Sequence, residues 1–276
     1  MKSIKLEFDK LKDALAYANV VLSDKGINEK LRNIIFLVSS ERVRIVGQNA
    51  FAFSRTSVDA EVEGVADDWK FQLKASELNK LLDGYSNLSR TKVDYLKFSE
   101  DGVRIKVKVH EEPLEGADDK LEQTSSFSFE NAPILKKVES EISQEFPSDV
   151  DMLPSGDIFF YLDALGGVLN NDTSNSIASK LNFAEDYVFV ITSFMAAFIP
   201  NKLPDSFKNL TVSYSSVAFL KKLSSVSDTL AVAKGDRYLC VQADTTEAFI
   251  QFQRVNVNYN MYVQKRSKDL GICMDR

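Results

Sequence analysis

Apolar and polar positions along this chain repeat one local pattern four times. Each repeat begins with a short strand, continues into an amphipathic helix, and is followed by a hairpin with a small, charged turn. The strand-to-helix steps lie at residues 4–11, 71–78, 158–165 and 210–217, and the hairpin turns at residues 40–42, 99–102, 184–186 and 234–236. Recurrence of one supersecondary unit is a signal about the whole fold, and it favours a symmetric scaffold over a single reaction centre.

The first two repeats predict a domain of the α+β class. In unit one we expect a strand at 3–8, a helix at 9–22 capped by Asp9, a hairpin with strands at 34–38 and 42–46, and a strand at 50–58. Unit two runs from residue 70 to about 129 and has its helix at 76–85. Its strand at 103–110 alternates between apolar and polar, mainly basic, residues, which is typical of a sheet with one face in water.

Residues 131–156 interrupt the pattern. They contain three prolines and a run of mixed charge, which predicts a connector that can hold a short helix. We therefore expect domain one at 1–130, an interdomain connector at 131–156, and domain two with a C-terminal tail at 157–276. In domain two the pattern predicts helices at 162–171 and 215–226, a hairpin within 177–192, and strands at 193–199, 229–233, 237–243 and 247–253.

Composition and charge are those of an ordinary globular protein. Of 276 residues, 44% are hydrophobic and 27% charged, and no run is long enough to span a membrane. The N-terminus is a charged strand pattern and not a signal peptide, and Cys240 and Cys273 are too few for a disulfide framework, so we expect a cytoplasmic protein. A net charge of -6 argues against binding nucleic acid over the whole surface, but leaves room for one local basic surface.

The residues that usually carry catalysis are scarce. His110 is the only histidine, at the end of the amphipathic strand, where we expect a solvated edge residue. Cys240 is predicted to be a buried strand residue, neither cysteine has a neighbouring histidine, and no glycine-rich phosphate motif is present. We therefore predict no catalytic residue, no metal site and no cofactor.

The exposed faces of the predicted helices carry lysines. These are Lys10 and Lys12 in the first helix, Lys80 in the second, and Lys221 and Lys222 in the fourth, with Arg90 and Lys92 just after the second. Acidic residues share these helices, and the third helix has no basic residue. The residues alone therefore leave an ordinary solvated helix face as the alternative to a DNA-binding face.

The order, spacing and register of the four units resemble the DNA sliding clamp family, the polymerase processivity factors, over nearly the whole chain. Residues 8–15, 35–49 and 71–82 carry the resemblance most clearly. It implies a ring of six domains with helices on the inner wall and sheets outside. A two-domain chain would then form a homotrimer, as in phage, archaeal and eukaryotic clamps. The acidic outside would repel DNA while the inner lysines attract phosphates weakly.

The same resemblance implies a function and partners. The protein would encircle double-stranded DNA without sequence preference and tether the replicative DNA polymerase. It would not be an enzyme, would need no cofactor, and would be opened by an ATP-driven clamp loader. The alternatives are a monomeric or dimeric clamp-fold processivity subunit, and a duplicated β-rich structural or assembly protein without a DNA role. In a virus, the location would be the host cytoplasm.

Two further surfaces follow from the resemblance. The strand at 123–129 would meet the strand at 193–198 of a neighbouring subunit through Phe127, Phe129, Phe194, Ala196 and Phe198. A polymerase peptide would bind an apolar groove beneath the connector, beside the C-terminal tail. The groove residues would be Ile45, Phe51, Phe146, Met152, Leu153, Tyr259, Met261 and Tyr262. Alternatively, the apolar connector residues only hold the connector against the sheet.

Overall fold

The computed structural model contains the four repeated units in chain order. It describes residues 1–22, 32–40, 42–49, 51–66, 68–86, 91–113, 123–169, 180–191 and 196–255. Unit one comprises β1 (Ser3–Glu7), α1 (Phe8–Leu22), β2 (Asn33–Val38), β3 (Val43–Gln48), β4 (Ala52–Val58) and the short β5 (Glu61–Glu63). Unit two comprises β6 (Trp69–Lys74), α2 (Ala75–Tyr85), β7 (Thr91–Asp101), β8 (Arg104–Pro113) and β9 (Gln123–Glu130).

A short helix, α3 (Lys136–Ile142), lies between the two halves of the chain. Unit three comprises β10 (Asp151–Pro154), α4 (Ser155–Leu169), β11 (Lys180–Phe183), β12 (Tyr187–Ile191) and β13 (Ala196–Pro200). After the 3-10 turn η2 (Asp205–Phe207), unit four comprises β14 (Leu210–Ser213), α5 (Tyr214–Ser224), β15 (Thr229–Lys234), β16 (Tyr238–Ala243) and β17 (Thr246–Gln251).

The units of each half exchange their first strands. β1 pairs with β7 of unit two, and β6 pairs with β2 of unit one. The second half repeats the exchange, because β10 pairs with β15 and β14 pairs with β11. Each pair of units is therefore interlocked and shares a hydrophobic core.

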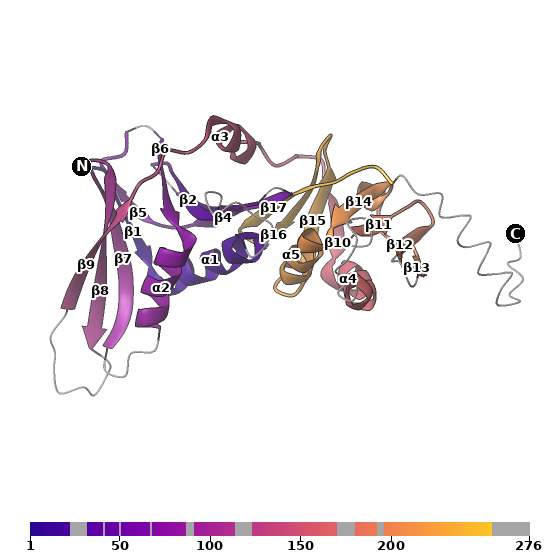
Figure 1. Ribbon diagram of the computed structural model, residues 1–276, viewed down its shortest axis with the longest axis horizontal. Helices are drawn as coiled ribbons and strands as arrows, with labels where there is room; N and C mark the ends of the chain where they lie inside the picture. The colour runs from indigo at the N-terminus through magenta and orange to yellow at the C-terminus, as the bar shows by residue number, and fades with distance from the viewer. Residues whose placement is uncertain are drawn as a thin grey trace, which may run out of the picture.

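One sheet crosses from the first half to the second. β17 pairs with β4 in antiparallel fashion, which joins four strands from each half in the order β10-β15-β16-β17-β4-β3-β2-β6. We call this eight-stranded sheet the central sheet. The other two sheets have the orders β5-β1-β7-β8-β9 and β13-β12-β11-β14, and we call them the first and second end sheets. β9 and β13 are edge strands that lie at opposite ends of the described structure in space (Figure 1).

Four helices lie in a row along one side of the sheets, in the order α2, α1, α5, α4, and α3 lies on the other side of the central sheet (Figure 1). Alternate strand residues supply the two faces. Ile34 and Phe36 of β2 pack into the core beneath the helix row, whereas Ile35 packs into a separate core with Ile142 of α3. The central sheet is therefore covered by the helix row on one face and partly covered by α3 on the other, and we call these its helix face and its connector face.

The spacing of apolar residues along α1 explains how this helix packs on the sheet. Its buried residues recur at helical spacing, and Leu11, Leu15 and Ala18 lie on the side toward the sheet. The helix comes so close to β3 that a Cβ atom at Gly47 would lie 2.5 Å from the carbonyl oxygen of Ala18. The predicted helix is confirmed, although it begins at Phe8, so Asp9 lies in its first turn and is not its cap.

The α+β class and three of the four strand-to-helix steps are confirmed. The step predicted at 158–165 is wrong, because the strand of unit three is β10 and the helix α4 starts at Ser155. The apolar run from Ile158 to Leu162 resembles a buried strand, but period alone cannot separate such a run from a buried helix segment. No helix in the described ranges is long and apolar enough to cross a lipid bilayer.

Candidate functional surfaces

Each helix of the row contacts the next one, in the spatial order α2, α1, α5, α4. The side-chain amides of Asn19 in α1 and Asn79 in α2 exchange two hydrogen bonds of 3.0 Å. α5 packs against both α1 and α4, and Lys221 of α5 forms an ion pair with Asp163 of α4. The row is therefore one continuous helical layer that extends across both halves of the chain (Figure 1).

The lysines predicted to contact DNA lie on this layer, and two of them are paired with acids. Lys10 bonds to Glu7 at 3.0 Å, which raises the pKa of the lysine, and Lys221 bonds to Asp163. Lys12 and Lys80 are exposed and Lys222 is partly exposed, and none of the three forms an ion pair with another described residue. These three are the cations most available to an external phosphate.

The layer as a whole is close to neutral. Its helices hold five lysines, at 10, 12, 80, 221 and 222, against six carboxylates, at 9, 13, 77, 83, 157 and 163, so their net formal charge is 5 minus 6, or -1. α4 contributes only acids. The positive charge of the layer is therefore limited to two lysines on α1, one on α2 and two on α5.

The two basic residues predicted after α2 do not join this layer. Lys92 lies opposite Glu112 in the β7–β8 ladder, and its neighbour Val93 points into the core beneath the helices. Because successive strand residues alternate between faces, Lys92 lies on the sheet face away from α2. This placement differs from the prediction that it borders the helix face, and Arg90 lies outside the described residues.

The residues predicted to form a subunit interface lie in or near β9 and β13, next to free strand edges. Phe127 and Phe129 pack into the core of the first half, and Phe198 stacks on Phe189 of β12. Ala196 is half-buried at the start of β13, and Phe194 lies outside the described residues. These side chains stabilise the faces of the end sheets, so the edges themselves offer mainly backbone groups.

The orientation of those backbone groups follows from hydrogen bonds at the strand ends. Asn131 N donates to Val103 O at 3.2 Å, and Asn201 N donates to Asp186 O at 2.8 Å. Hydrogen-bonded and non-hydrogen-bonded pairs alternate along an antiparallel ladder. The N–H and C=O groups of Ser128 in β9 and of Phe198 in β13 therefore point outward, away from the strands they already pair with.

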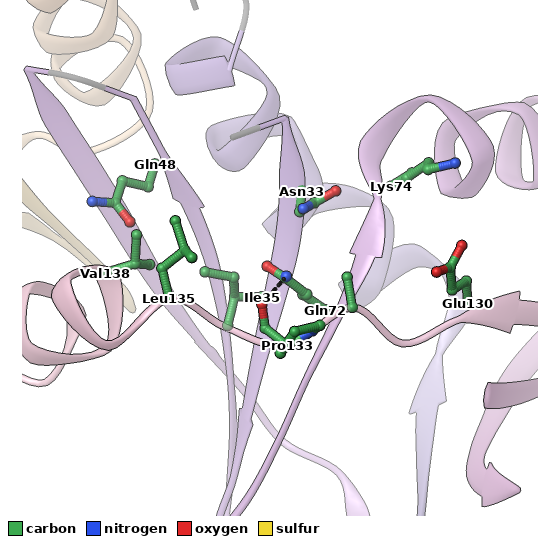
Figure 2. Close-up of a pocket in the computed structure, with 10 residues that line it drawn as sticks. Asn33, Ile35, Gln48, Gln72, Lys74, Glu130, Pro133, Leu135 and Val138 are labelled. Atoms are coloured by element: carbon green, nitrogen blue, oxygen red, sulfur yellow. Dashed lines mark hydrogen bonds between the residues drawn. The ribbon is translucent and has the colours of Figure 1, made fainter. Parts of the chain in front are cut away.

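A groove lies on the connector face of the central sheet, between three strands and the connector (Figure 2). Its volume is about 490 Å³. The strands supply Asn33 and Ile35 of β2, Gln48 of β3 and Gln72 of β6, and the connector supplies Pro133, Leu135 and Val138. A second cavity of about 300 Å³ shares Gln48, Leu135 and Val138 and continues toward Phe51, Tyr238 and Arg237. We call the two cavities together the connector groove.

Polar contacts hold the connector over this groove. Gln72 Nε2 donates to Pro133 O at 3.0 Å (Figure 2). Lys70 Nζ bonds to Glu139 at 2.8 Å. Farther along, Gln48 Nε2 donates to Glu141 Oε2 at 2.7 Å. The hydrogen bond to Lys70 lowers the pKa of Glu139. Contacts within the chain thus fix the connector over the groove at both ends of α3.

The connector groove combines exposed apolar side chains with one unsatisfied polar group. Leu135 is 62% exposed and Phe51 is 46% exposed, although both are large hydrophobic residues. Gln48, by contrast, is buried, and its Oε1 atom accepts no hydrogen bond from any described residue. A buried acceptor without a donor is unfavourable, so a ligand that brings an N–H group and an apolar side chain would satisfy both features.

Only part of the predicted groove is found here. Phe51 lines it, whereas Phe146 of the connector packs edge-on against Phe249 of the sheet. Ile45 points to the helix face and Leu153 lies in the core of the second half, so neither can line this groove. Met152 of β10 is 66% exposed and lies on the connector face. β10 is three strands away from β17 in the central sheet, which corresponds to about 14 Å at the usual strand spacing. Tyr259, Met261 and Tyr262 lie outside the described residues.

The groove residues that the prediction missed carried a usable signal. Ile134, Val138 and Ile142 recur every four residues, which is helical spacing, and all three pack on the core beneath α3. The mixed charges between them obscured this period. Leu135 lies beside that apolar stripe and for this reason faces the groove and not the core.

Comparisons with known proteins identify the fold. No protein-family model matches the sequence, and no curated protein sequence matches it significantly. Solved structures do match. The β subunit of DNA polymerase III from Thermotoga maritima superposes with a TM-score of 0.68 at 12% identity, over 95% of this chain and 67% of that chain.

Two further structures agree. The β subunit from Borrelia burgdorferi, in complex with a natural product, gives a TM-score of 0.69 at 12% identity, over 99% of this chain and 74% of that chain. A DnaN sliding clamp from Pseudomonas aeruginosa, bound to griselimycin, gives 0.66 at 11% identity, over 94% and 67%. The chain therefore has the fold of the DNA sliding clamps.

Proposed function

From this sliding-clamp fold we propose that the protein is a ring-shaped processivity factor, which encircles double-stranded DNA and tethers a DNA polymerase to it. The observation that carries the proposal is the relationship among the strands that come third after the helix in each of the four units. β4 and β17 pair within the chain, whereas β9 and β13 are left as edges at its two ends.

The internal β4–β17 junction is a template for a junction between subunits. β4 and β17 are the third strands after the helix in units one and four, and β9 and β13 are the third strands after the helix in units two and three. Antiparallel pairing of β9 with β13 of a second copy would repeat the same contact and would remove both exposed edges. The outward-pointing backbone groups of Ser128 and Phe198 provide donors and acceptors for such a ladder.

Repeating one head-to-tail contact closes a ring when the rotation per subunit divides the circle. This chain aligns with 67% of the Thermotoga maritima chain, as two domains would align with a chain of three. Three copies of a two-domain chain give six domains, so we propose a homotrimer. A monomeric or dimeric clamp-fold subunit that binds DNA on its open helix face is the second candidate, since the free edges alone do not fix the number of copies.

The helix layer would face DNA in such a ring. The near-neutral charge of the layer, with Lys12, Lys80 and Lys222 as its unpaired cations, suits weak contacts to phosphates. Contacts to phosphates carry no sequence information, so such binding would not depend on the bases. Weak and sequence-independent contacts allow a ring to slide. Topological enclosure, and not affinity, would keep the protein on the template.

The connector groove is the proposed partner site. A short peptide from the polymerase would place an apolar side chain between Ile35, Leu135 and Val138 and offer an N–H group to Gln48 Oε1. Peptide recognition of this kind rests on a few deep anchors. The function needs no catalytic residue and no cofactor. An ATP-driven loader would open the ring, in the cytoplasm or in the host cytoplasm.

Topological retention on DNA tests this function. The protein is loaded onto nicked circular DNA with the loader and polymerase of its own replication system, and the DNA is then linearised. A ring stays on the circle in high salt and slides off after linearisation. An open-face binder dissociates in high salt from both forms, and a structural protein without a DNA role binds neither.

A further inference from the structure

The outward face of the first end sheet carries three metal-ligating side chains at one point. Asp94 of β7 and His110 and Glu112 of β8 place their ligand atoms within 4.8 Å of one another. The face lies away from the helix layer and is separate from the connector groove. The cluster includes the imidazole of the only histidine in the chain, which distinguishes it from an ordinary group of surface acids.

A β-bulge brings Asp94 to this face. Val93 lies opposite Glu111 and Tyr95 lies opposite His110, so Asp94 has no residue opposite it. Val93 and Leu96 are both buried, so the two residues between them, Asp94 and Tyr95, both project to the outer face. In a regular strand only one residue on the outer face separates two successive buried residues. A bulge is a common means of redirecting a side chain. Here it adds a carboxylate beside the imidazole on the neighbouring strand.

The surrounding side chains form no hydrogen bond or ion pair with the three metal-ligating groups in the described part of the chain, and Tyr95 holds the His110 imidazole in place. The His110 ring stacks on Tyr95 at 4.6 Å between centroids, and Lys5 Nζ lies 4.3 Å from the Tyr95 ring centroid. Lys92 lies opposite Glu112 in the ladder, yet the two form no ion pair, and none of the three ligand side chains donates or accepts a hydrogen bond within the described part of the chain.

We propose that Asp94, His110 and Glu112 form a binding site for a first-row divalent metal ion, with Zn²⁺ as its probe. One imidazole nitrogen and two carboxylate oxygens suit such an ion, whereas Mg²⁺ and Ca²⁺ prefer oxygen ligands alone. Three protein ligands leave at least one coordination position for water. The ion would neutralise two adjacent carboxylates and link β7 to β8 across the bulge.

The site is tested on the full chain by Zn²⁺ titration in a calorimeter after treatment with a chelator. All proteins carry Cys273→Ser, which removes a thiol that could compete for the ion. Cys240 needs no substitution, because burial raises its pKa to about 12 and the thiolate is the form that binds metals. We expect one Zn²⁺ per chain, with a matching rise in the melting temperature.

Two variants and a control decide the assignment. His110→Gln and Asp94→Asn should each weaken Zn²⁺ binding by roughly tenfold or more. Glu61→Gln removes a carboxylate from the same sheet face, outside the cluster, and should leave Zn²⁺ affinity unchanged. Equal affinity in the parent and in His110→Gln, or no saturable binding at about 1 mM Zn²⁺, would overturn the proposal. Neither result bears on DNA encirclement.

Discussion

Arg55 of β4 and Glu247 of β17 lie directly opposite each other across the junction of the two halves, with Arg55 Nε 2.6 Å from Glu247 Oε2. The same guanidinium donates through Nη1 to the carbonyl oxygens of Ile142 at 3.1 Å and Gln144 at 2.8 Å. Arg55 is 3% exposed. One buried side chain therefore joins both halves of the chain and the end of α3.

Replacing Arg55 tests the importance of this junction. Arg55→Met leaves Glu247 and two connector carbonyls without their donor, so we expect the free energy of unfolding to fall by about 3 kcal/mol. The urea midpoint, followed by circular dichroism, measures the change. Lys5→Met breaks the exposed pair with Glu61 and serves as the control, with little change expected. Equal midpoints for both variants would show that the junction does not depend on Arg55.

The close approach of α1 to β3 gives a second prediction. Gly47→Ala places a methyl group against the α1 backbone at Ala18 and should destabilise the protein by ~1–3 kcal/mol. Gly166→Ala, within α4, adds a methyl group where no atom lies within 4 Å and should stabilise it by ~0.5–1 kcal/mol. Melting temperatures of the two variants should move in opposite directions. A rise for Gly47→Ala would contradict the observed helix–sheet packing.

The connector groove is tested with a peptide from the C-terminus of the polymerase. Leu135→Ser removes an exposed apolar wall, so the fold should survive while peptide affinity falls by about tenfold, which is close to 1.4 kcal/mol. Met152→Ser changes an equally exposed apolar residue on the same sheet face and should leave affinity unchanged. The opposite result in titration calorimetry would move the partner site to β10.

The lysines of the helix layer are tested by the salt dependence of DNA binding. Lys12→Glu, Lys80→Glu and Lys222→Glu together should weaken binding and reduce the slope of log affinity against log salt by about 0.9 for each phosphate that the variant no longer neutralises. Lys106→Glu with Lys108→Glu reverses charge on β8, on the sheet face away from the helices, and is the control. An equal effect of the control would place DNA outside the ring.

Local periods in the sequence were sufficient for most elements. Alternation predicted β8, and helical spacing predicted α1, α2 and α5 within one or two residues. The strand β10 was not predicted, because it has only four residues and is followed directly by the long apolar helix α4. So short a strand shows almost no alternation of apolar and polar residues. Gly166 and Gly167 lie within α4, and a Cβ atom at either position would project into open space.

Contacts between distant segments could not be derived from the sequence. Arg55 and Glu247 are 192 positions apart, and no local pattern pairs them. The same holds for the site at Asp94, since only the bulge in β7 reveals that this carboxylate shares a face with His110. A groove was predicted beneath the connector, but the residues that line the cavity found there depend on which side chains face outward from β2, β3 and β6.

The mass of the protein in solution, measured by light scattering with and without a block at the β9 edge, tests the ring most directly. The ring predicts three times 31.0 kDa for the native chain and for Ser128→Ala, which keeps the outward N–H group. Ser128→Pro deletes that donor and should give single chains of 31.0 kDa with unchanged circular dichroism. A native chain that runs as a stable 31.0 kDa monomer at micromolar concentration would contradict the ring.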